Sequence, residues 1–218
     1  MQLLSIDLKK PSPAIINQAL AVLMAGGVVV YPTDTAYGLA VDATNEEAIG
    51  KLFVIKRRAQ KALPVLVTGM LMAKQLVEVD PVAHALMKTY WPGAVTFILP
   101  HKKTLPPALL LGKPGLGVRQ ADQPIAQALV RGLGRPITST SANLSGAGVF
   151  YSGQEVARHF AQQPMQPDMV LDAGDIPEEP PSTIIDLVAR PPVVLRQGAV
   201  RVQLGKRTTA KPALRTKR

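Results

Sequence analysis

Residues 14–31 read AIINQALAVLMAGGVVVY, in which a helical pattern is followed at once by a strand pattern. Up to residue 25, the apolar side chains recur every three to four residues, as on the buried face of a helix. Gly26-Gly27 is typical of a helix end, and the run Val28-Val29-Val30-Tyr31 is typical of a buried strand. This unit predicts a fold in which helices pack against a sheet.

The same alternation of helix and strand continues along the chain. We expect further helices at 45–55, 70–78, 80–90, 123–132 and 153–162, with one helical turn inside 103–112. We expect further strands at 63–67, 94–99, 117–119, 135–140, 169–172, 182–188 and 193–197. Because no helix separates the last two strands, the sheet should contain both parallel and antiparallel pairs. The predicted fold class is therefore α/β, with helices flanking a mixed parallel/antiparallel sheet.

Composition limits the chemistry that is available. The chain has 218 residues, 47% of them hydrophobic, which is enough for one domain with a sizeable core. It has no cysteine, which excludes disulfides, thiol nucleophiles and cysteine zinc sites, and its three histidines lie far apart. No apolar run reaches the roughly 18 residues of a membrane helix, and the N-terminus lacks a signal-peptide pattern. We therefore expect a cytoplasmic protein with no membrane contact.

The net charge of +10 is concentrated at the C-terminus. Residues 206–218 contain Lys206, Arg207, Lys211, Arg215, Lys217 and Arg218, with no acidic residue among them. We expect a main domain at residues 1–203 and a basic, disordered tail at residues 204–218. Such a tail either contacts RNA phosphates or is simply solvated, and the sequence leaves both alternatives open.

A run of small polar residues marks a candidate site. Residues 138–146 read TSTSANLSG and follow the start of the predicted strand at 135–140. Hydroxyl and amide groups at the end of a strand offer several hydrogen-bond donors to a phosphate or a carboxylate. The alternative is a serine-rich loop that caps the next helix, and this run alone does not decide between the two.

Familiar nucleotide-binding and hydrolase motifs are absent. The chain has no GxxxxGK[ST], no GxGxxG and no GxSxG, which excludes the usual ATPase, dehydrogenase and hydrolase classes. Four other segments place polar groups just after a predicted element: 32–39 (PTDTAYGL), 56–58 (KRR), 117–119 (GVR), and Ser182-Thr183 with Arg196. Taken singly, each has an ordinary explanation as a turn, a helix C-terminus or a surface ion pair.

Together, these segments resemble the YrdC-like family. The run at 32–39 is similar to the family signature PT[ED]TxYGL, Lys56-Arg57-Arg58 to its KxR, and Ser141-Ala142-Asn143 to its SxN. Further matches occur in the same order as in the family: 91–93 (WPG), 117–119 (GVR), 182–186 (STIID) and 195–198 (LRQG). The resemblance covers residues 10–200 and rests on seven ordered motifs.

The resemblance implies a fold and an activity. It implies a twisted, mixed sheet around a concave, positively charged cavity, and the activity of threonylcarbamoyl-AMP synthases. These enzymes are nucleotidyltransferases that convert L-threonine, bicarbonate and ATP into threonylcarbamoyl-AMP and pyrophosphate. The product goes to the tRNA threonylcarbamoyl-transfer machinery, which modifies adenosine next to the anticodon.

In this reaction an anionic carbamate attacks a polyanionic nucleotide, so the protein must hold and neutralise like charges. The resemblance implies catalytic roles for Lys56 and Arg58. It implies ATP-binding roles for Lys56, Arg58, Ser141, Asn143 and Arg196, and threonine-binding roles for Thr33, Thr35, Arg119, Ser139 and Ser182. Mg²⁺ is expected with ATP, held mainly by phosphates and water. No metal-binding residue is predicted, and Asp34 is only a weak candidate.

The chain departs from the family pattern in two places. Ala59-Gln60-Lys61 follows Arg58, where family members usually have proline and then an acidic residue. Pro181 stands where the family usually has an acidic residue before Ser182. Two alternatives to a synthase therefore stay open: a non-catalytic relative that binds tRNA or double-stranded RNA, and a paralogue that adenylates another carbamate.

Overall fold

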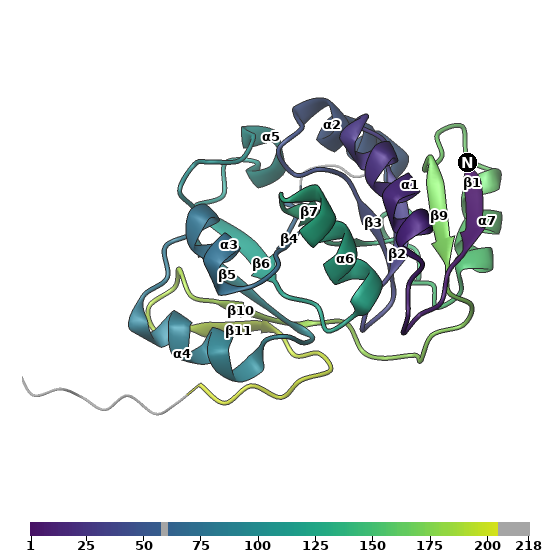
Figure 1. The fold of residues 1–218 in the computed structure, drawn as a ribbon. Helices are drawn as coiled ribbons and strands as arrows, with labels where there is room; N and C mark the ends of the chain where they lie inside the picture. Colours follow the sequence, from purple (N-terminus) through teal and green to yellow (C-terminus); the bar gives the residue numbers. More distant parts are fainter. Residues whose placement is uncertain (58–60, 205–218) are drawn as a thin grey trace, which may run out of the picture.

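The computed structural model describes residues 1–57 and 61–204 (Figure 1). Its elements in chain order are β1 (Gln2–Ser5), α1 (Pro13–Met24), β2 (Val29–Pro32), β3 (Tyr37–Ala40), α2 (Glu46–Ile55), β4 (Val65–Leu66), α3 (Met70–Leu76), α4 (Pro81–Tyr90), β5 (Val95–Pro100), α5 (Pro107–Leu110), β6 (Gly115–Arg119), α6 (Pro124–Leu133), β7 (Ile137–Thr138), β8 (Thr140–Ser141), α7 (Gly153–Ala161), β9 (Met169–Asp172), β10 (Thr183–Asp186) and β11 (Val193–Arg196). The predicted α/β class is confirmed. Arg58 and the predicted tail beyond Leu204 lie outside the described residues. In the described part of the chain, no helix has the length and apolar character needed to cross a membrane.

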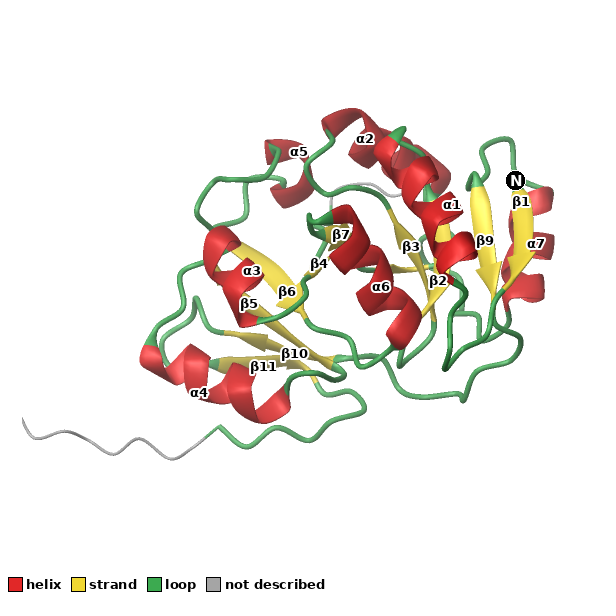
Figure 2. Cartoon of the chain, viewed as in Figure 1, coloured by secondary structure: helices red, strands yellow, loops and turns green. Residues whose placement is uncertain are grey.

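The strands form two mixed sheets in different halves of the molecule, where a single sheet was expected (Figure 2). The five-stranded sheet has the order β1-β9-β2-β3-β8, and the six-stranded sheet has the order β11-β10-β5-β6-β4-β7. In the first, β9 is parallel to β1 and β2, whereas β3 is antiparallel to both of its neighbours. In the second, β10 is parallel to β5 and β4 to β6, and the remaining pairs are antiparallel.

The chain passes from one sheet to the other within the predicted strand 135–140. β7 pairs with β4, and two residues later β8 pairs with β3. Thr138 supports this crossing because its Oγ1 accepts from the Val41 N–H (3.0 Å) and donates to the Leu39 carbonyl (3.1 Å). The run has an uninterrupted strand pattern, so the sequence alone could not reveal that it is shared between two sheets.

Helices α1 and α6 pack together, and a glycine permits their close approach. In the sequence, Gly132 and Gly134 both predict an end for the helix at 123–132. Gly134 does end α6, with a positive φ of 68° that glycine adopts without strain. Gly132 instead lies inside α6, where a Cβ would come within 2.5 Å of Leu20 Cδ1 on α1. Its role is therefore helix packing.

Two strands were not predicted. β1 is largely exposed and so has no pattern of alternating buried residues. β3 lies inside the segment 32–39, which was interpreted as polar chain following a strand. In the structure Pro32 ends β2, the chain turns through 33–36, and Tyr37 begins β3, antiparallel to β2. The PTDTAYGL segment is therefore the tip and second strand of a β-hairpin.

The N-terminus of α4 offers a test of local electrostatics. The Asp80 carboxylate accepts from the Ala83 N–H (2.7 Å) and pairs with Arg190 (2.6 Å). The hydrogen bond from Ala83 is the main cause that lowers the pKa of Asp80 below its ordinary value. Because the folded-state pKa is lowered, the ionised carboxylate stabilises the fold above the ordinary pKa, and this contribution is lost as pH falls through the lowered pKa. We expect Asp80→Ala to cost about 1 kcal/mol at neutral pH.

Urea unfolding at neutral pH and below pH 3.8 checks this expectation. Asp80→Asn keeps a cap acceptor but cannot ionise, so it should lose less stability than Asp80→Ala at neutral pH. The stability difference between wild type and Asp80→Asn should shrink on acidification. A difference that does not change with pH would show that the ionised form contributes nothing.

Candidate active site

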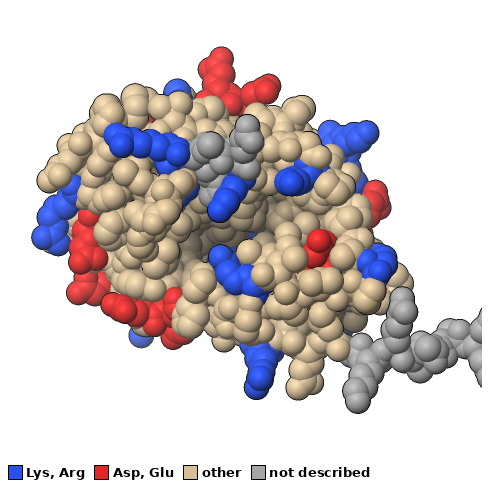
Figure 3. Space-filling view, turned by 180° about the vertical axis from the view of Figure 1, so that it is seen from behind, with Lys and Arg blue, Asp and Glu red and all other residues tan. Residues whose placement is uncertain are grey.

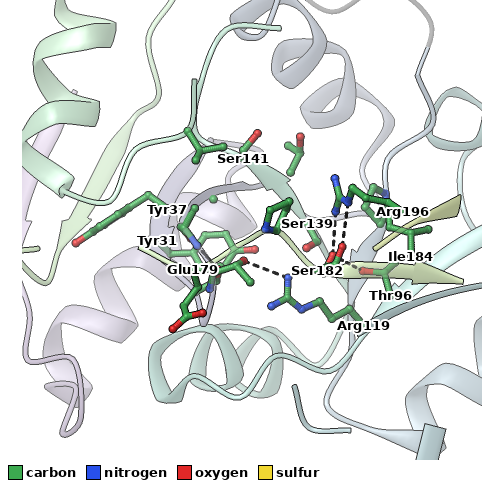
Figure 4. Close-up of a pocket in the computed structure, with 18 residues that line it drawn as sticks. Tyr31, Tyr37, Thr96, Arg119, Ser139, Ser141, Glu179, Ser182, Ile184 and Arg196 are labelled. Carbon is green, nitrogen blue, oxygen red and sulfur yellow. Dashed lines mark hydrogen bonds between the residues drawn. The ribbon is translucent and has the colours of Figure 1, made fainter. Parts of the chain in front are cut away.

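A cavity of about 320 Å³ lies between the two sheets (Figure 4). The five-stranded sheet contributes Tyr31 and Ser141 to its lining, and the six-stranded sheet contributes Thr96, Arg119 and Arg196. Seen from behind, the molecule is hollowed near its middle, and Lys or Arg side chains stand beside the hollow (Figure 3). Because both sheets line the cavity, its shape depends on how the sheets are joined.

The tip of the β2–β3 hairpin supplies two threonine hydroxyls. Thr33 Oγ1 donates to the Ala36 carbonyl (2.7 Å) and accepts from the N–H groups of Thr35 (3.1 Å) and Ala36 (3.2 Å). Such bonds are typical of threonine in a tight turn, so Thr33 fixes the hairpin tip. Thr35 Oγ1 lies 3.1 Å from Thr33 Oγ1 and also accepts from Arg119 (3.4 Å). Thr35 therefore carries its hydroxyl next to a charged group.

Arg119 ends β6 and connects the two sheets. Its Nη2 pairs with the Asp34 carboxylate, and its Nε donates to the Gly93 carbonyl (3.3 Å). The second Asp34 oxygen accepts from the Asp122 N–H (3.2 Å), so this carboxylate is committed to the fold. The Arg119 side chain is only 6% exposed. Together with the bond to Thr35, these contacts within the described part of the chain use three of its five N–H groups, so two remain for a ligand.

The opposite wall is a hydrogen-bonded set from β5, β11 and the residue before β10. Ser182 Oγ lies 3.0 Å from Thr96 Oγ1. Arg196 donates from Nε to the Ser182 carbonyl (3.0 Å) and from Nη2 to Ser182 Oγ (3.2 Å). Gly198 crosses this backbone so closely that a Cβ on it would lie 1.9 Å from the Pro181 carbonyl oxygen. The position of Arg196 thus depends on a close backbone crossing.

Two guanidinium groups therefore line one cavity, on either side of Ser182 (Figure 4). Burial lowers the pKa of Arg196, and the positive charge of Arg119 lowers it further. Among residues 1–57 and 61–204, Arg119 pairs with Asp34, whereas no carboxylate oxygen lies within 4.0 Å of Arg196. Two like charges held in a partly buried cavity favour an anionic ligand between them.

The serine-rich run forms the next part of the wall and is held by Lys56. Ser139 and Ser141 line the cavity, whereas Asn143 is 6% exposed and is not part of the lining. Ser141 Oγ donates to Asn143 Oδ1 (2.6 Å), and Lys56 Nζ contacts both residues. The run caps no described helix, since the next helix, α7, begins at Gly153. The run therefore forms a polar wall of the cavity and does not act as a cap for any described helix.

The structure brings most of the predicted site residues together. The cavity lining includes Thr33, Thr35, Arg119, Ser139, Ser141, Ser182 and Arg196. Lys56 and Asn143 are outside this lining, and Arg58 lies outside the described residues. The lining residues that were not predicted from the sequence include Tyr31, Thr96 and Glu179. Tyr31 and Thr96 lie within apolar strands, where nothing in the local pattern marks them as part of a site.

Comparison with known proteins assigns this architecture to a family. A family model named Sua5_yciO_yrdC, with the description "Telomere recombination", matches residues 21–198. The chain belongs to the Sua5/YciO/YrdC family. The matched range contains the hairpin at 32–39, the Lys56 segment, the serine-rich run and the Arg196 segment, so the family resemblance seen in the sequence is confirmed.

Individual members of the Sua5/YciO/YrdC family are similar to the chain over most of its length. The "Uncharacterized protein YciO" of Escherichia coli K12 is 37% identical over 195 residues, which cover 86% of this chain and 91% of that protein. A "Threonylcarbamoyl-AMP synthase" of Saccharophagus degradans is 34% identical over 179 residues, covering 79% of this chain and 90% of that protein. The structure of P. abyssi Sua5 complexed with L-threonine matches with a TM-score of 0.85 and 30% identity over 91% of this chain. This chain spans 58% of the length of that Sua5 chain.

Proposed function

We propose that this chain is an L-threonylcarbamoyladenylate synthase, a nucleotidyltransferase that makes threonylcarbamoyl-AMP and pyrophosphate from L-threonine, bicarbonate and ATP. The observation that carries the proposal is the placement of Arg119 and Arg196 in one hydroxyl-lined cavity. Two cationic groups in one cavity suit a reaction that must join two anions. Relatives named threonylcarbamoyl-AMP synthase at 34–35% identity support the same assignment.

The Arg119 side of the cavity would bind threonine. Contacts with described residues use three N–H groups of Arg119. The other two are enough for a bidentate bond to an amino-acid carboxylate. The hydroxyls of Thr35 and Ser139 lie in the same lining and would bond the rest of the substrate. Thr33 would contribute by fixing the hairpin tip, and Ser182 by orienting Arg196.

The Arg196 side would bind the nucleotide phosphates. Arg196 keeps N–H groups beyond those that it donates to Ser182, and Ser141 lies in the same lining. Mg²⁺ would enter with ATP, held mainly by phosphate oxygens and water. The hydroxyls and the Glu179 carboxylate of the lining are oxygen donors, the ligand type that suits this ion.

The chemical step requires orientation and charge neutralisation more than a protein nucleophile. Threonine and bicarbonate condense to a carbamate with loss of water, and one oxygen of this carbamate attacks the α-phosphorus. A bond between that oxygen and phosphorus forms, the bond to the bridging oxygen breaks, and pyrophosphate leaves with the electron pair. Because the nucleophile is already anionic, no protein base is needed in this step. Arg58, outside the described residues, stays a predicted catalytic residue.

Measurement of pyrophosphate release tests the proposal. Release should require ATP, bicarbonate and L-threonine together. Arg196→Lys should raise the KM for ATP more than the KM for threonine, because lysine keeps the charge but loses the fork of N–H donors. No release, together with salt-sensitive binding of tRNA or double-stranded RNA, would support the non-catalytic alternative. Release that depends on an amine other than threonine would support the paralogue.

The product of this reaction carries an activated carbamoyl group, so the next reaction must transfer that group to a nucleophile. We propose the tRNA threonylcarbamoyl-transfer machinery, in the cytoplasm, as the consumer of the product. Direct contact of this chain with tRNA is a separate prediction that the RNA-binding measurement above also tests.

A further inference from the structure

The ammonium group of Lys56 is enclosed by the serine-rich loop. Lys56 is the C-cap residue of α2 and is 1% exposed. Its Nζ donates to the carbonyl oxygens of Ser141 and Asn143 (2.8 Å for the latter) and lies 3.3 Å from Asn143 Oδ1. Its own carbonyl accepts from the Ser145 N–H (3.0 Å). The loop at 141–145 therefore wraps around one lysine.

The loop supplies as many acceptor oxygens as the ammonium of Lys56 has donors. An ammonium has three N–H groups, and the three loop oxygens can accept all of them. Charge-assisted hydrogen bonds are strong, and oxygens left buried without a donor are costly. Asn143 Oδ1 also accepts from Ser141 Oγ (2.6 Å). The position of Ser141 in the cavity lining is thus tied to Lys56.

We propose that Lys56 is a positioning residue, which fixes the loop at 141–145 and does not itself contact the nucleotide. This inference rests on the proposed function, because it concerns the nucleotide side of the same cavity. It replaces the direct ATP contact that the family resemblance implies for Lys56. A direct contact would require a side chain that is 1% exposed to release a loop oxygen.

The first test uses the wild-type protein, labelled with ¹⁵N at lysine side chains. The Lys56 signal is assigned by its absence in Lys56→Arg. If the loop holds the ammonium, its protons exchange slowly with water, and its ¹⁵N shift stays unchanged when saturating ATP is added. Fast exchange without ATP, or a large shift on ATP addition, would overturn the proposal.

The second test compares Lys56→Met with Lys51→Met. Lys51 lies on the same helix and donates to the Gly26 carbonyl (3.2 Å), away from the cavity lining. Lys56→Met should speed amide hydrogen exchange at 139–147. It should also weaken ATP and AMP binding by the same factor, about ten- to a hundredfold, as expected for a group that orients a ligand-binding residue. Lys51→Met should change neither property.

The losses of ATP affinity and of AMP affinity in Lys56→Met separate a positioning role from a direct phosphate contact. If Lys56→Met weakened ATP binding far more than AMP binding and left loop exchange unchanged, Lys56 would be a phosphate ligand and the proposal would be wrong. The proposed function fails separately, if the wild-type protein binds neither ATP nor AMP. In that case the hydrogen-exchange comparison, which needs no ligand, still decides whether Lys56 holds the loop.

Discussion

Arg119→Ala is expected to lower threonine-dependent pyrophosphate release by roughly two to three orders of magnitude. The reason is that removing one partner of a buried charge pair costs about 2–5 kcal/mol. The substitution removes the guanidinium that we assign to the threonine carboxylate. It also leaves the Asp34 carboxylate, with a side chain 15% exposed, without its counter-charge. The main kinetic change should be a raised KM for threonine, with a smaller change in the KM for ATP.

Arg135→Ala is the matched control for this variant. Arg135 also pairs with a buried aspartate, Asp42, at 2.8 Å, but it does not line the cavity. Both variants should lose stability in thermal unfolding, whereas only Arg119→Ala should raise the KM for threonine. Equal kinetic losses in the two variants would show that Arg119 acts through stability alone and would remove it from the threonine site.

Gly198→Ala is expected to cause the largest loss of stability among single-methyl additions near the site. Its Cβ would lie 1.9 Å from the Pro181 carbonyl oxygen and 2.6 Å from the Ser182 carbonyl carbon, both of which belong to the backbone. Overpacking commonly costs about 1–3 kcal/mol, and we expect the upper end because no side chain can move aside. For a chain of this length, that is a fall in Tm of about 6–12 °C. The shift should also separate Arg196 from Ser182 and weaken nucleotide binding.

Gly50→Ala gives the opposite expectation for the same chemical change. Gly50 lies inside α2, and a Cβ there would have nothing within 4 Å. Alanine should therefore stabilise the helix by up to about 1 kcal/mol. Thermal unfolding of the two variants in parallel tests the close crossing at Gly198. A Gly198→Ala protein as stable as wild type would contradict the described backbone geometry.

Local patterns were sufficient to predict most of the fold. The spacing of Ile16, Leu20 and Leu23 and the glycine after them predicted α1, and all three side chains are buried. Asparagine is a favoured N-cap residue, and the side chain of Asn45, at the start of α2, accepts from the Ala48 N–H (3.1 Å). Periodicity and capping are properties of short segments, so one sequence is enough to reveal them.

The contacts that build the cavity could not be predicted in the same way. The Arg119–Asp34 pair joins residues 85 positions apart, and Lys56 reaches a loop 85 to 87 positions further along the chain. The sequence offered helix-end complementarity as the ordinary explanation for Lys56, because only the tertiary fold brings the serine-rich loop to it. The family resemblance indicated which residues matter, but the structure is needed to propose how each one acts.

The most direct measurement is mass spectrometry of the nucleotide products formed from ¹³C-bicarbonate, L-threonine and ATP. It tests the central claim that the cavity between the two sheets joins a carbamate to a nucleotide. We predict a threonylcarbamoyl-AMP adduct that carries the ¹³C label and is absent without threonine. The adduct should be lost in Arg119→Ala and kept in Arg135→Ala. No labelled adduct from folded wild-type protein, or an equal yield from Arg119→Ala, would contradict the account.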